Sequence, residues 1–511
     1  MRKLSRIVAA MILTLVCFSL SGISQNKIIV HVDQPGSLID KAIYGQFAEH
    51  LGHCIYGGFW VGDTSSIPNV RGIRKDVVVA LKEMNISVLR WPGGCFADTY
   101  HWRDGIGPRE KRPSIINVNW GGVTEDNSFG THEFMDLCEQ LGCDAYISGN
   151  VGSGTVQEMT EWVEYMTSDV ESPMTKLRKQ NGREKPWKVK YLGIGNEAWG
   201  CGGSMTPEFY SNLCRQYGTY VKSACPSLIK IASGASDSDL NWTDVVMKNV
   251  GSRIQDVSLH YYTLPGNWSL KGSATNFTTN DWFTVLRKTL VMDTLINKHI
   301  SVMDKYDKKI GLMVDEWGTW YDVEPGTNPG FLFQQNTLRD ALVAGINLNI
   351  FNNHADRVKM ANIAQVINVL QSVIFTKGRE MVLTPTYFVF KMYRVHQDAK
   401  MLPIEIKCNK YTSGSESIDA INASASVKDG VVNITLCNLD PVNSQAISFD
   451  IQGVKVATVS GQIVTADKIN AYNDFGKKEE VTLADFKNAK LNKGQVEATI
   501  PAKSVVLIQL K

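Results

Sequence analysis

The amino-acid sequence predicts an α/β fold: a (β/α)8 barrel followed by a C-terminal all-β sandwich. Between residues 41 and 395, eight short apolar segments alternate with amphipathic stretches, which is typical of parallel α/β folds. Eight is the number of strands that closes such a barrel. After about residue 400 helical periodicity is nearly absent, and strand-like segments are separated by Gly, Asn and Lys.

The predicted barrel strands are short and apolar. They lie at residues 43–47, 87–91, 145–148, 190–194, 229–232, 257–260, 310–314 and 348–351. One helix is predicted to begin after the N-cap residue Thr206. Its buried face is expected to carry Phe209, Leu213, Tyr217 and Tyr220. A second helix is predicted over residues 281–306. An open doubly wound sheet is the alternative, but no glycine-rich phosphate loop follows the first strand.

The two ends of the chain are expected to add to this arrangement. Residues 27–33 are strand-like and precede the barrel, so we expect residues 25–40 to add a strand to the sandwich. The barrel is expected at 41–395 and the sandwich at 396–511. A length of 511 residues agrees with about two domains.

The first residues resemble a secretory signal peptide at 1–24. Three basic residues precede an apolar run over residues 7–20, and Gly22 and Ser24 occupy the −3 and −1 positions of a cleavage site. The run is short for a membrane span and no second span follows. We therefore expect a secreted or periplasmic protein with no membrane association after cleavage. An uncleaved anchor is the alternative.

Composition excludes several classes of partner. The 53 Lys and Arg residues nearly balance 51 Asp and Glu, which argues against nucleic acid or an anionic membrane surface as a partner. The 12 tryptophans and 17 tyrosines suit the faces of sugar rings, although aromatic residues are also ordinary core material. Signal removal leaves nine cysteines without paired spacing, so we expect packing residues, with Cys95 as the one exception, and no disulfide framework and no zinc site.

Two glutamates, each at the end of an apolar run and each beside a tryptophan, are the most informative residues. Glu197 is followed by Ala198 and Trp199, and Glu316 is followed by Trp317. A carboxylate at the mouth of a buried strand is costly to desolvate, so it is usually kept for chemistry or paired with a cation. A pair of salt-bridged structural glutamates is the alternative to a catalytic pair.

Polar residues gather at the predicted carboxyl ends of the strands, where barrels of this kind carry their active sites. They are Glu49, Arg90, Cys95, Asn150, Asn196, Glu197, His260, Tyr262, Glu316, Asn352, Asn353, His354 and Gln365. Buried polar groups need hydrogen-bond partners, so a role in packing alone poorly explains this number of polar residues at the strand ends.

These residues fit a retaining glycosidase, in which one carboxyl protonates the departing oxygen and a second attacks the anomeric carbon. The two carboxyls of such an enzyme lie about 5–5.5 Å apart. Strands four and seven would place Glu197 and Glu316 across a narrow barrel mouth. Asn196 would bond a sugar hydroxyl, while Arg90 and Tyr262 would hold the nucleophile.

The sequence resembles the α-L-arabinofuranosidases of glycoside hydrolase family 51. The matching segments are Gly-Gln-Phe-Ala-Glu-His at 45–50, Leu-Arg-Trp-Pro-Gly-Gly at 89–94, Gly-Asn-Glu at 195–197, His-Tyr-Tyr at 260–262, Asp-Glu-Trp at 315–317 and Asn-Asn-His-Ala-Asp-Arg-Val-Lys at 352–359. Gly-Asn-Glu marks only the wider clan, whereas the 89–94 and 352–359 segments are more specific. The resemblance runs from about residue 27 to the C-terminus and is weakest after residue 400.

The resemblance implies a role for each site residue. Glu197 would be the acid/base and Glu316 the nucleophile. Glu49, Asn196 and Gln365 would hold the arabinofuranose hydroxyls, Trp120 and Trp320 would wall the pocket, and Arg90, His260 and Tyr262 would support the nucleophile. No cofactor and no metal are expected. Family members are often oligomeric, so the resemblance also implies a homo-oligomer.

Cys95 departs from some family members, which carry asparagine after the Gly-Gly pair. A thiol is a weak hydrogen-bonding group, so a sugar contact there would be weaker, and we treat Cys95 as a substrate-binding position that marks specificity.

The expected activity is removal of terminal α-L-arabinofuranosyl groups from arabinan or arabinoxylan pieces. The alternatives are a β-xylosidase or endo-glucanase of the same clan, or a carbohydrate-binding protein without catalysis.

Overall fold

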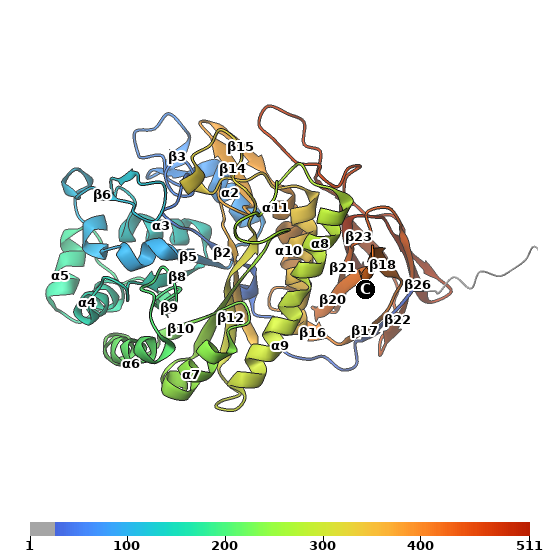
Figure 1. Cartoon of the computed structure of the whole chain (residues 1–511), viewed down its shortest axis with the longest axis horizontal. Helices are drawn as coiled ribbons and strands as arrows, with labels where there is room; N and C mark the ends of the chain where they lie inside the picture. Colours follow the sequence, from blue (N-terminus) through green and yellow to red (C-terminus); the bar gives the residue numbers. More distant parts are fainter. Residues whose placement is uncertain (1–25) are drawn as a thin grey trace, which may run out of the picture.

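A closed barrel of eight parallel strands forms the centre of the structure, a computed structural model that describes residues 26–511. This confirms the predicted fold class. Figure 1 shows the barrel and its helices on the left and a β-rich domain on the right, with α10 and α11 between them. The barrel strands are β2 (Gly45–Phe47), β5 (Val88–Trp91), β8 (Asp144–Gly149), β9 (Val189–Ile194), β10 (Ile229–Ser236), β11 (Asp256–Thr263), β12 (Gly311–Thr319) and β13 (Val358–Ala364).

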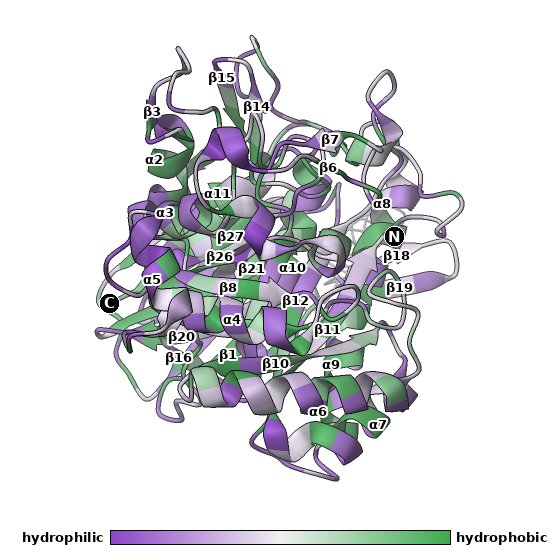
Figure 2. Cartoon of the chain, turned by 90° about the vertical axis from the view of Figure 1, so that its left-hand side faces the viewer, coloured by the Kyte–Doolittle hydropathy of each residue, from purple (hydrophilic) through white to green (hydrophobic). Residues whose placement is uncertain are grey.

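Helices cover the outside of the barrel. They are α2 (Lys75–Glu83), α3 (Thr131–Leu141), α4 (Val156–Thr167), α5 (Pro173–Gln180), α6 (Pro207–Ala224), α7 (Leu240–Val250), α8 (Thr279–Thr289), α9 (Val291–Met303), α10 (Leu338–Asn353) and α11 (Pro385–Tyr393). Hydrophilic and hydrophobic residues alternate along α6 and α7 in Figure 2, as expected for helices with one face on a core. Among residues 26–511, no helix combines the length and the apolar character that a membrane crossing requires.

The eighth strand is not where the sequence pattern placed it. Residues 348–351 belong to helix α10, and the eighth strand is β13. Helix α10 is buried on nearly every side, so it has no polar face that would reveal a helical period. A short apolar run within such a helix has the same appearance as a buried strand.

Two helix predictions also need correction. The stretch 281–306 forms two helices, α8 and α9, which meet at Leu290. Helix α6 begins as predicted, since Thr206 accepts a hydrogen bond from the Phe209 amide. Its buried face is offset, however, because Phe209 and Tyr220 are each 54% exposed while the next residues, Tyr210 and Val221, are buried.

The C-terminal domain consists of two facing sheets rich in antiparallel strands. The sheet orders are β17-β1-β22-β26-β25 and β16-β20-β21-β27-β23-β24. Their strands are β1 (Asn26–His31), β16 (Lys400–Leu402), β17 (Ile404–Lys407), β20 (Ile421–Lys428), β21 (Val431–Asn438), β22 (Gln445–Gln452), β23 (Val459–Val464), β24 (Leu483–Asp485), β25 (Ala489–Asn492), β26 (Gln495–Ile500) and β27 (Ser504–Leu510). Strand β1 lies between β17 and β22, antiparallel to the first and parallel to the second.

The six-stranded sheet connects the two domains. In β27, Val506 and Ile508 belong to the sandwich core, whereas Val505 and Leu507 belong to the core that continues into the barrel. Because successive side chains of a strand point to opposite faces, this strand is buried on both sides. The barrel and the sandwich therefore share one packed interface.

Short hairpins complete the chain outside these layers. They are β3 (Asn69–Val70) with β4 (Ile73–Arg74), β6 (Ile115–Ile116) with β7 (Thr124–Glu125), β14 (Ile374–Lys377) with β15 (Glu380–Leu383), and β18 (Lys410–Ser413) with β19 (Glu416–Asp419).

Candidate active site

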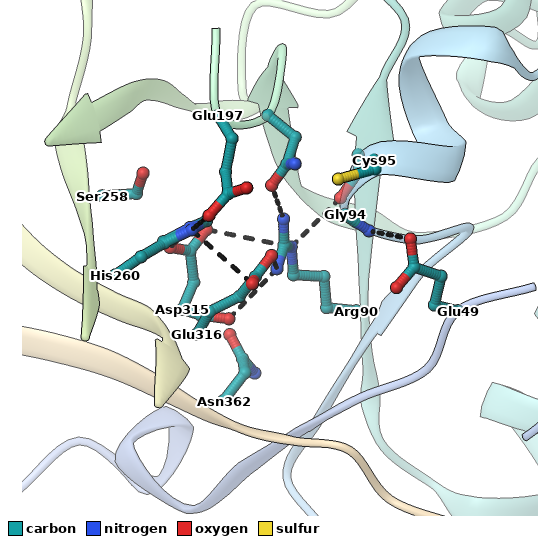
Figure 3. A network of polar contacts seen from close by, with 12 residues as sticks. Glu49, Arg90, Gly94, Cys95, Glu197, Ser258, His260, Asp315, Glu316 and Asn362 are labelled. Atoms are coloured by element: carbon teal, nitrogen blue, oxygen red, sulfur yellow. Dashed lines mark hydrogen bonds and ion pairs between the residues drawn. The ribbon is translucent and has the colours of Figure 1, made fainter. Parts of the chain in front are cut away.

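The carboxyl ends of the barrel strands bring most of the predicted site residues together (Figure 3). Arg90 lies in β5, His260 and Tyr262 lie in β11, and Glu316 lies in β12. Glu49, the pair Asn196 and Glu197, and Gln365 follow directly after β2, β9 and β13. Parallel strands open at the same end of a barrel, so residues far apart in the sequence meet there.

Glu316 is held by a cation and a hydroxyl group. Its side chain is 7% exposed, and its Oε1 lies 2.8 Å from Nη1 of Arg90. Tyr262 donates its phenolic proton to Oε2 at 2.8 Å. These contacts compensate the negative charge of the buried carboxylate and fix its orientation.

Arg90 is itself fixed by several acceptors. It is 1% exposed and donates to the Asp315 carbonyl at 3.1 Å, to Oδ1 of Asn196 at 2.6 Å and to Ser148 at 3.1 Å. Its guanidinium carbon lies 4.4 Å from the centre of the Phe47 ring. A planar guanidinium with its donors occupied in this way has one orientation, which aims Nη1 at Glu316.

Glu197 has a different environment. Its side chain is 19% exposed, and Oε1 lies 2.9 Å from Nδ1 of His260. Burial raises the pKa of Glu197; the hydrogen bond from His260 opposes that shift and the nearby charge of Glu316 adds to it. Burial is thus the largest cause of the raised pKa of Glu197, ahead of the charge of Glu316.

His260 connects the two glutamates to Asp315. Its Nε2 lies 3.1 Å from Oδ1 of Asp315, and its Nδ1 lies 3.6 Å from Oε2 of Glu316. Burial lowers its pKa, but Glu316, Asp315 and Glu197 outweigh burial and raise the pKa of His260 to about 10. The imidazole is therefore a cation within a group of three acids.

Asp315 was missing from the sequence-based site. Side chains alternate along a strand, so Asp315 and Glu316 would ordinarily face opposite sides of β12. The register between β11 and β12 shifts after Ser258, however, and places an extra residue in β12. Both carboxylates consequently reach the barrel interior, where Tyr146 donates to Asp315 at 2.7 Å.

Glu49 marks the other side of the mouth. Its Oε1 accepts hydrogen bonds from the amides of Gly94 and Phe96 and from Nε1 of Trp120, at 2.9–3.1 Å, and Oε2 accepts one from Gln365 at 2.9 Å. Burial raises the pKa of Glu49 to about 7, against these bonds, which favour the carboxylate.

Two buried polar atoms near this point have no partner in the protein. They are Nδ2 of Asn196, a donor, and Oε1 of Gln365, an acceptor. Buried polar groups are almost always paired, so unpaired ones beside a carboxylate indicate a place for a hydroxylated ligand.

Glu197 sits on a constrained turn. Its φ angle of 40° lies in the left-handed region, which is unusual for a residue with a side chain. The Gly200 and Gly202 amides donate to the Glu197 carbonyl, and Tyr210 donates to the Ile194 carbonyl just before the turn. The surrounding contacts therefore hold the carboxyl at the mouth.

Cys95 forms a disulfide bond with Cys201, which corrects the expectation that the cysteines are packing residues without a disulfide framework. The two are 106 residues apart and meet because the loops after β5 and β9 adjoin at the mouth. Sγ of Cys201 lies 3.5 Å from Oε2 of Glu197. The remaining cysteines among residues 26–511 are free.

Several polar residues of the sequence-based group lie elsewhere or have structural partners. Asn352 and Asn353, at the end of α10, donate to Ser424 and to the Ala423 carbonyl of the sandwich. His354 pairs with Asp293 of α9. Asn150 caps its own loop, accepting from the Ser153 and Gly154 amides. Asn352, Asn353 and His354 were expected at the barrel mouth because residues 348–351 were predicted to form the eighth strand, and these residues instead belong to α10. This reason does not apply to Asn150.

Two clusters in the described part of the chain bring metal-ligating atom types within 4.8 Å of one another. One comprises Glu197, His260 and Glu316, and the other Cys95, Glu197 and Cys201. In the first, Arg90 already supplies a positive charge to Glu316. In the second, both sulfurs are engaged in the disulfide.

Comparisons with known proteins agree with this geometry. A family model for the alpha-L-arabinofuranosidase 1 domain matches residues 80–280, and one for the alpha-L-arabinofuranosidase C-terminal domain matches 315–504. An intracellular exo-alpha-L-arabinofuranosidase of Bacteroides ovatus is 56% identical over 498 residues, or 96% of this chain and 97% of that protein. The GH51 arabinofuranosidase of Xanthomonas axonopodis pv. citri superposes with a TM-score of 0.94 at 50% identity, covering 95% of this chain and 100% of that one. The chain belongs to the α-L-arabinofuranosidases of glycoside hydrolase family 51.

Family membership confirms the resemblance seen in the sequence and identifies the chain as a glycoside hydrolase. The arabinofuranosidase of Thermotoga maritima, solved as an arabinose complex, is more distant at 28% identity but superposes with a TM-score of 0.85 over 95% of this chain and 99% of that one. The fold and the family thus extend over nearly the whole chain.

The predicted secreted or periplasmic location is wrong by the same comparison, because the relative that is 56% identical is named an intracellular enzyme. The predicted signal peptide at 1–24 lies outside the described residues.

Proposed function

We propose that this arabinofuranosidase removes terminal non-reducing α-L-arabinofuranosyl groups from arabinan-type or arabinoxylan-type chains, with retention of the anomeric configuration. The observation that carries the proposal is the contrast between two neighbouring carboxyls. Glu316 is paired with a cation and a hydroxyl donor, whereas burial raises the pKa of Glu197. Such a pair suits a nucleophile and an acid.

The proposed reaction has two displacements. Glu316 attacks the anomeric carbon while Glu197 gives its proton to the departing glycosidic oxygen, which releases the rest of the chain as an alcohol. Glu197 then takes a proton from water, whose oxygen attacks the anomeric carbon and frees Glu316. Oxygens of Glu197 and Glu316 lie within 4.8 Å, which agrees with the short carboxyl separation of retaining enzymes.

Buried polar atoms without a protein partner at the mouth support the proposed sugar-holding roles. Glu49, Asn196 and Gln365 would bond the arabinofuranose hydroxyls, since Nδ2 of Asn196 and Oε1 of Gln365 are buried without partners. Trp120 would wall the pocket beside Glu49, to which it donates at 2.9 Å, and Trp320 would wall it beside Tyr262. Arg90, His260 and Tyr262 would position the two carboxyls.

The proposal is tested by hydrolysis of nitrophenyl α-L-arabinofuranoside beside the β-D-xyloside and β-D-glucoside, with the anomeric product followed by NMR. We expect fast arabinofuranoside cleavage that first releases the α-anomer. Initial release of the β-anomer would contradict the double displacement, and activity confined to another glycoside would contradict the substrate.

The two glutamates are distinguished by replacement. Glu316→Ala should lower turnover of every substrate by several orders of magnitude. Glu197→Ala should still cleave nitrophenyl substrates, because a good leaving group needs little protonation, and added azide should accelerate it by attacking from the vacated side. Equal and azide-insensitive losses in both variants would reject the assigned roles.

A homo-oligomeric assembly is also proposed, supported by the family resemblance alone. Light scattering at micromolar concentration tests it, and a monomer mass would reject it.

A further inference from the structure

The hairpin of β6 and β7 has an inverted side-chain pattern (Figure 2). The apolar side chains of Ile116 and Val118 are 68% and 69% exposed, while the polar Asn117 between them is 1% exposed. Successive side chains of an extended segment point to opposite sides, so this hairpin turns an asparagine toward the protein and two aliphatic residues toward solvent. A sequence that breaks the usual pattern in this way is expected where a residue serves a function.

The Asn117 side chain forms three hydrogen bonds. Its Nδ2 donates to the His50 carbonyl at 2.7 Å and to Oε1 of Glu125 at 3.0 Å. Its Oδ1 accepts from the backbone amide of Trp120 at 2.9 Å. A carbonyl only accepts and a backbone amide only donates, so one orientation of the Asn117 amide satisfies these partners and the reverse orientation does not.

The backbone partners of Asn117 belong to segments that carry proposed sugar-holding residues. The His50 carbonyl comes directly after Glu49 in the chain, and Trp120 carries the indole that donates to Oε1 of Glu49 at 2.9 Å. These contacts close a ring. Within it, Asn117 fixes the backbone of Trp120 relative to the segment that carries Glu49.

The base of the hairpin is held by a second buried contact. Glu125 of β7 is 5% exposed, and its Oε2 lies 3.6 Å from Nδ1 of His50. The indole of Trp91 donates to Nε2 of His50 at 3.1 Å, so this nitrogen is an acceptor and the imidazole proton lies on Nδ1, toward Glu125. Both sides of the hairpin therefore contact the residue that follows Glu49.

The position of Trp120 matters because Glu49 depends on it. Oε1 of Glu49 accepts from the amides of Gly94 and Phe96, which belong to one backbone segment, and from the Trp120 indole, which belongs to the hairpin. Burial raises the pKa of Glu49 to about 7, and the Trp120 hydrogen bond is one of those that oppose this shift. A displaced Trp120 would remove both a pocket wall and a donor that favours the carboxylate.

We propose that Asn117 is a positioning residue for the sugar pocket, which holds Trp120 against Glu49 so that the pocket is formed before the sugar binds. The inference rests on the proposed function, which places the arabinofuranose there. Asn117 acts on binding of the removed sugar and not on the two displacements, since the hydrogen-bond partners of Glu197 and Glu316 lie outside the hairpin.

The first test separates binding from turnover. Asn117→Ala should raise KM for nitrophenyl α-L-arabinofuranoside about three- to tenfold, the range that a lost hydrogen bond supports, while kcat changes less than about twofold. Asn117→Asp should raise KM at least as much, because it keeps the acceptor for the Trp120 amide but sets an oxygen against the His50 carbonyl. A loss confined to kcat, or an unchanged KM in both variants, would reject the proposal.

A double-variant cycle identifies the route. Trp120→Phe keeps an aromatic wall but removes the indole donor to Glu49. If Asn117 acts by placing that donor, both substitutions remove the same interaction. Asn117→Ala should then change KM less than about twofold in the Trp120→Phe background. Effects of the two substitutions that multiply fully would contradict this route.

Asn473→Ala is the matched control for loss of a buried asparagine. Asn473 is also 1% exposed. Its Nδ2 donates to the carbonyls of Leu383 and Val481, and its Oδ1 accepts from the amides of Glu480 and Val481, in the loop between β23 and β24. This variant should lower the unfolding temperature as Asn117→Ala does and leave KM unchanged. A KM raised equally in both would assign the effect to general destabilisation and reject positioning.

Hydrogen–deuterium exchange followed by mass spectrometry tests the support without a substrate. Peptides covering residues 115–125 should exchange faster in Asn117→Ala than in the wild type or in Asn473→Ala, because the Trp120 amide has lost its acceptor. If the wild type does not cleave the nitrophenyl arabinofuranoside, the proposed function fails, and faster exchange would still support Asn117 as the residue that holds Trp120. Equal exchange in all three proteins would reject it.

Discussion

At the residue scale, the chemistry depends on the different surroundings of two similar side chains. Glu316 faces Arg90 and Tyr262, whereas Glu197 faces His260 and is 19% exposed. The two carboxyls are close enough that, besides burial, the charge of Glu316 contributes to the raised pKa of Glu197. This difference in environment supports the proposed roles of Glu197 as the acid and Glu316 as the nucleophile.

The pH dependence of activity should follow the raised pKa of Glu197. An acid must carry its proton, so kcat/KM for arabinobiose should fall on the alkaline side at a pH above the ordinary 4.5 of a glutamate. His260→Asn removes the hydrogen bond and positive charge that lower the pKa of Glu197. The alkaline limb of the pH–rate profile should therefore move to higher pH, while kcat/KM falls. A pH–rate profile checks both statements. A limb that moves to lower pH in His260→Asn would contradict them.

Arg90 should tolerate no replacement, including lysine. Arg90→Lys keeps a charge but loses the planar fork that bonds Glu316, Asn196 and Ser148 together. We expect kcat to fall by about 100-fold or more, on the scale of losing a charge-stabilising donor in an active site. Separate measurement of kcat and KM checks this. A rise in KM with unchanged kcat would assign Arg90 to binding alone.

At the element scale, loops after neighbouring strands are joined into one support. The short 3₁₀ helix Cys95–Thr99 follows β5; its Phe96 amide bonds Glu49, and its Asp98 accepts from the amides of Val151 and Asn196. Burial raises the pKa of Asp98 to about 7, although these amide bonds favour its carboxylate. The disulfide to Cys201 closes this support beside Glu197.

Loss of the disulfide should weaken the protein and loosen the sugar pocket. Cys201→Ser should lower the free energy of unfolding by about 2–4 kcal/mol, the typical worth of a disulfide. The disulfide joins the loop that carries the Phe96 amide to the loop that carries Glu197. Its loss should let these two loops move relative to each other, so KM should rise several-fold. Urea unfolding with and without a phosphine reductant measures the stability.

The reductant provides the control for that experiment. The reduced wild type should match Cys201→Ser, and the reductant should have no further effect on the variant. Cys225→Ser, which replaces a free and half-buried cysteine, should behave as the wild type. A wild type whose urea midpoint ignores the reductant would contradict the prediction.

At the scale of the whole molecule, helix α10 belongs to both domains. It is buried along nearly its whole length between the barrel and the six-stranded sheet. Oδ1 of Asn349 accepts hydrogen bonds from Ser424 at 2.9 Å and Thr435 at 2.7 Å, and its Nδ2 donates to Asn422 at 2.9 Å. Polar groups buried at this interface specify one docking geometry.

Asn349→Ala should therefore destabilise both domains together. It leaves the hydroxyls of Ser424 and Thr435 without their shared acceptor, which costs about 1–3 kcal/mol. We expect one calorimetric transition at a lower temperature. Asn297→Ala, on the exposed face of α9, is the control and should change stability by less than about 0.5 kcal/mol. Two separated transitions in the wild type would contradict a shared interface.

Much of the molecule could be predicted from local patterns. Seven of the eight predicted strands are barrel strands, because short apolar runs between helix signals report burial directly. The eighth was missed because α10 is buried on all sides and has no polar face. Glu197 and Glu316 could be recognised because burying a carboxylate at the end of an apolar strand costs desolvation free energy, so such a residue is usually paired with a cation or used in chemistry.

The sequence by itself determined most of the barrel strands, through the periodicity of short segments, and the residues at the strand ends, whose motifs carry the resemblance to the family. Only the tertiary structure decided that Cys95 meets Cys201, that the irregularity in β12 turns Asp315 inward beside Glu316, and that Trp320 contacts the rings of both Tyr262 and Trp268. Those relations join side chains on different strands and loops. Barrel closure and register set them, and no local pattern in the chain encodes such distances.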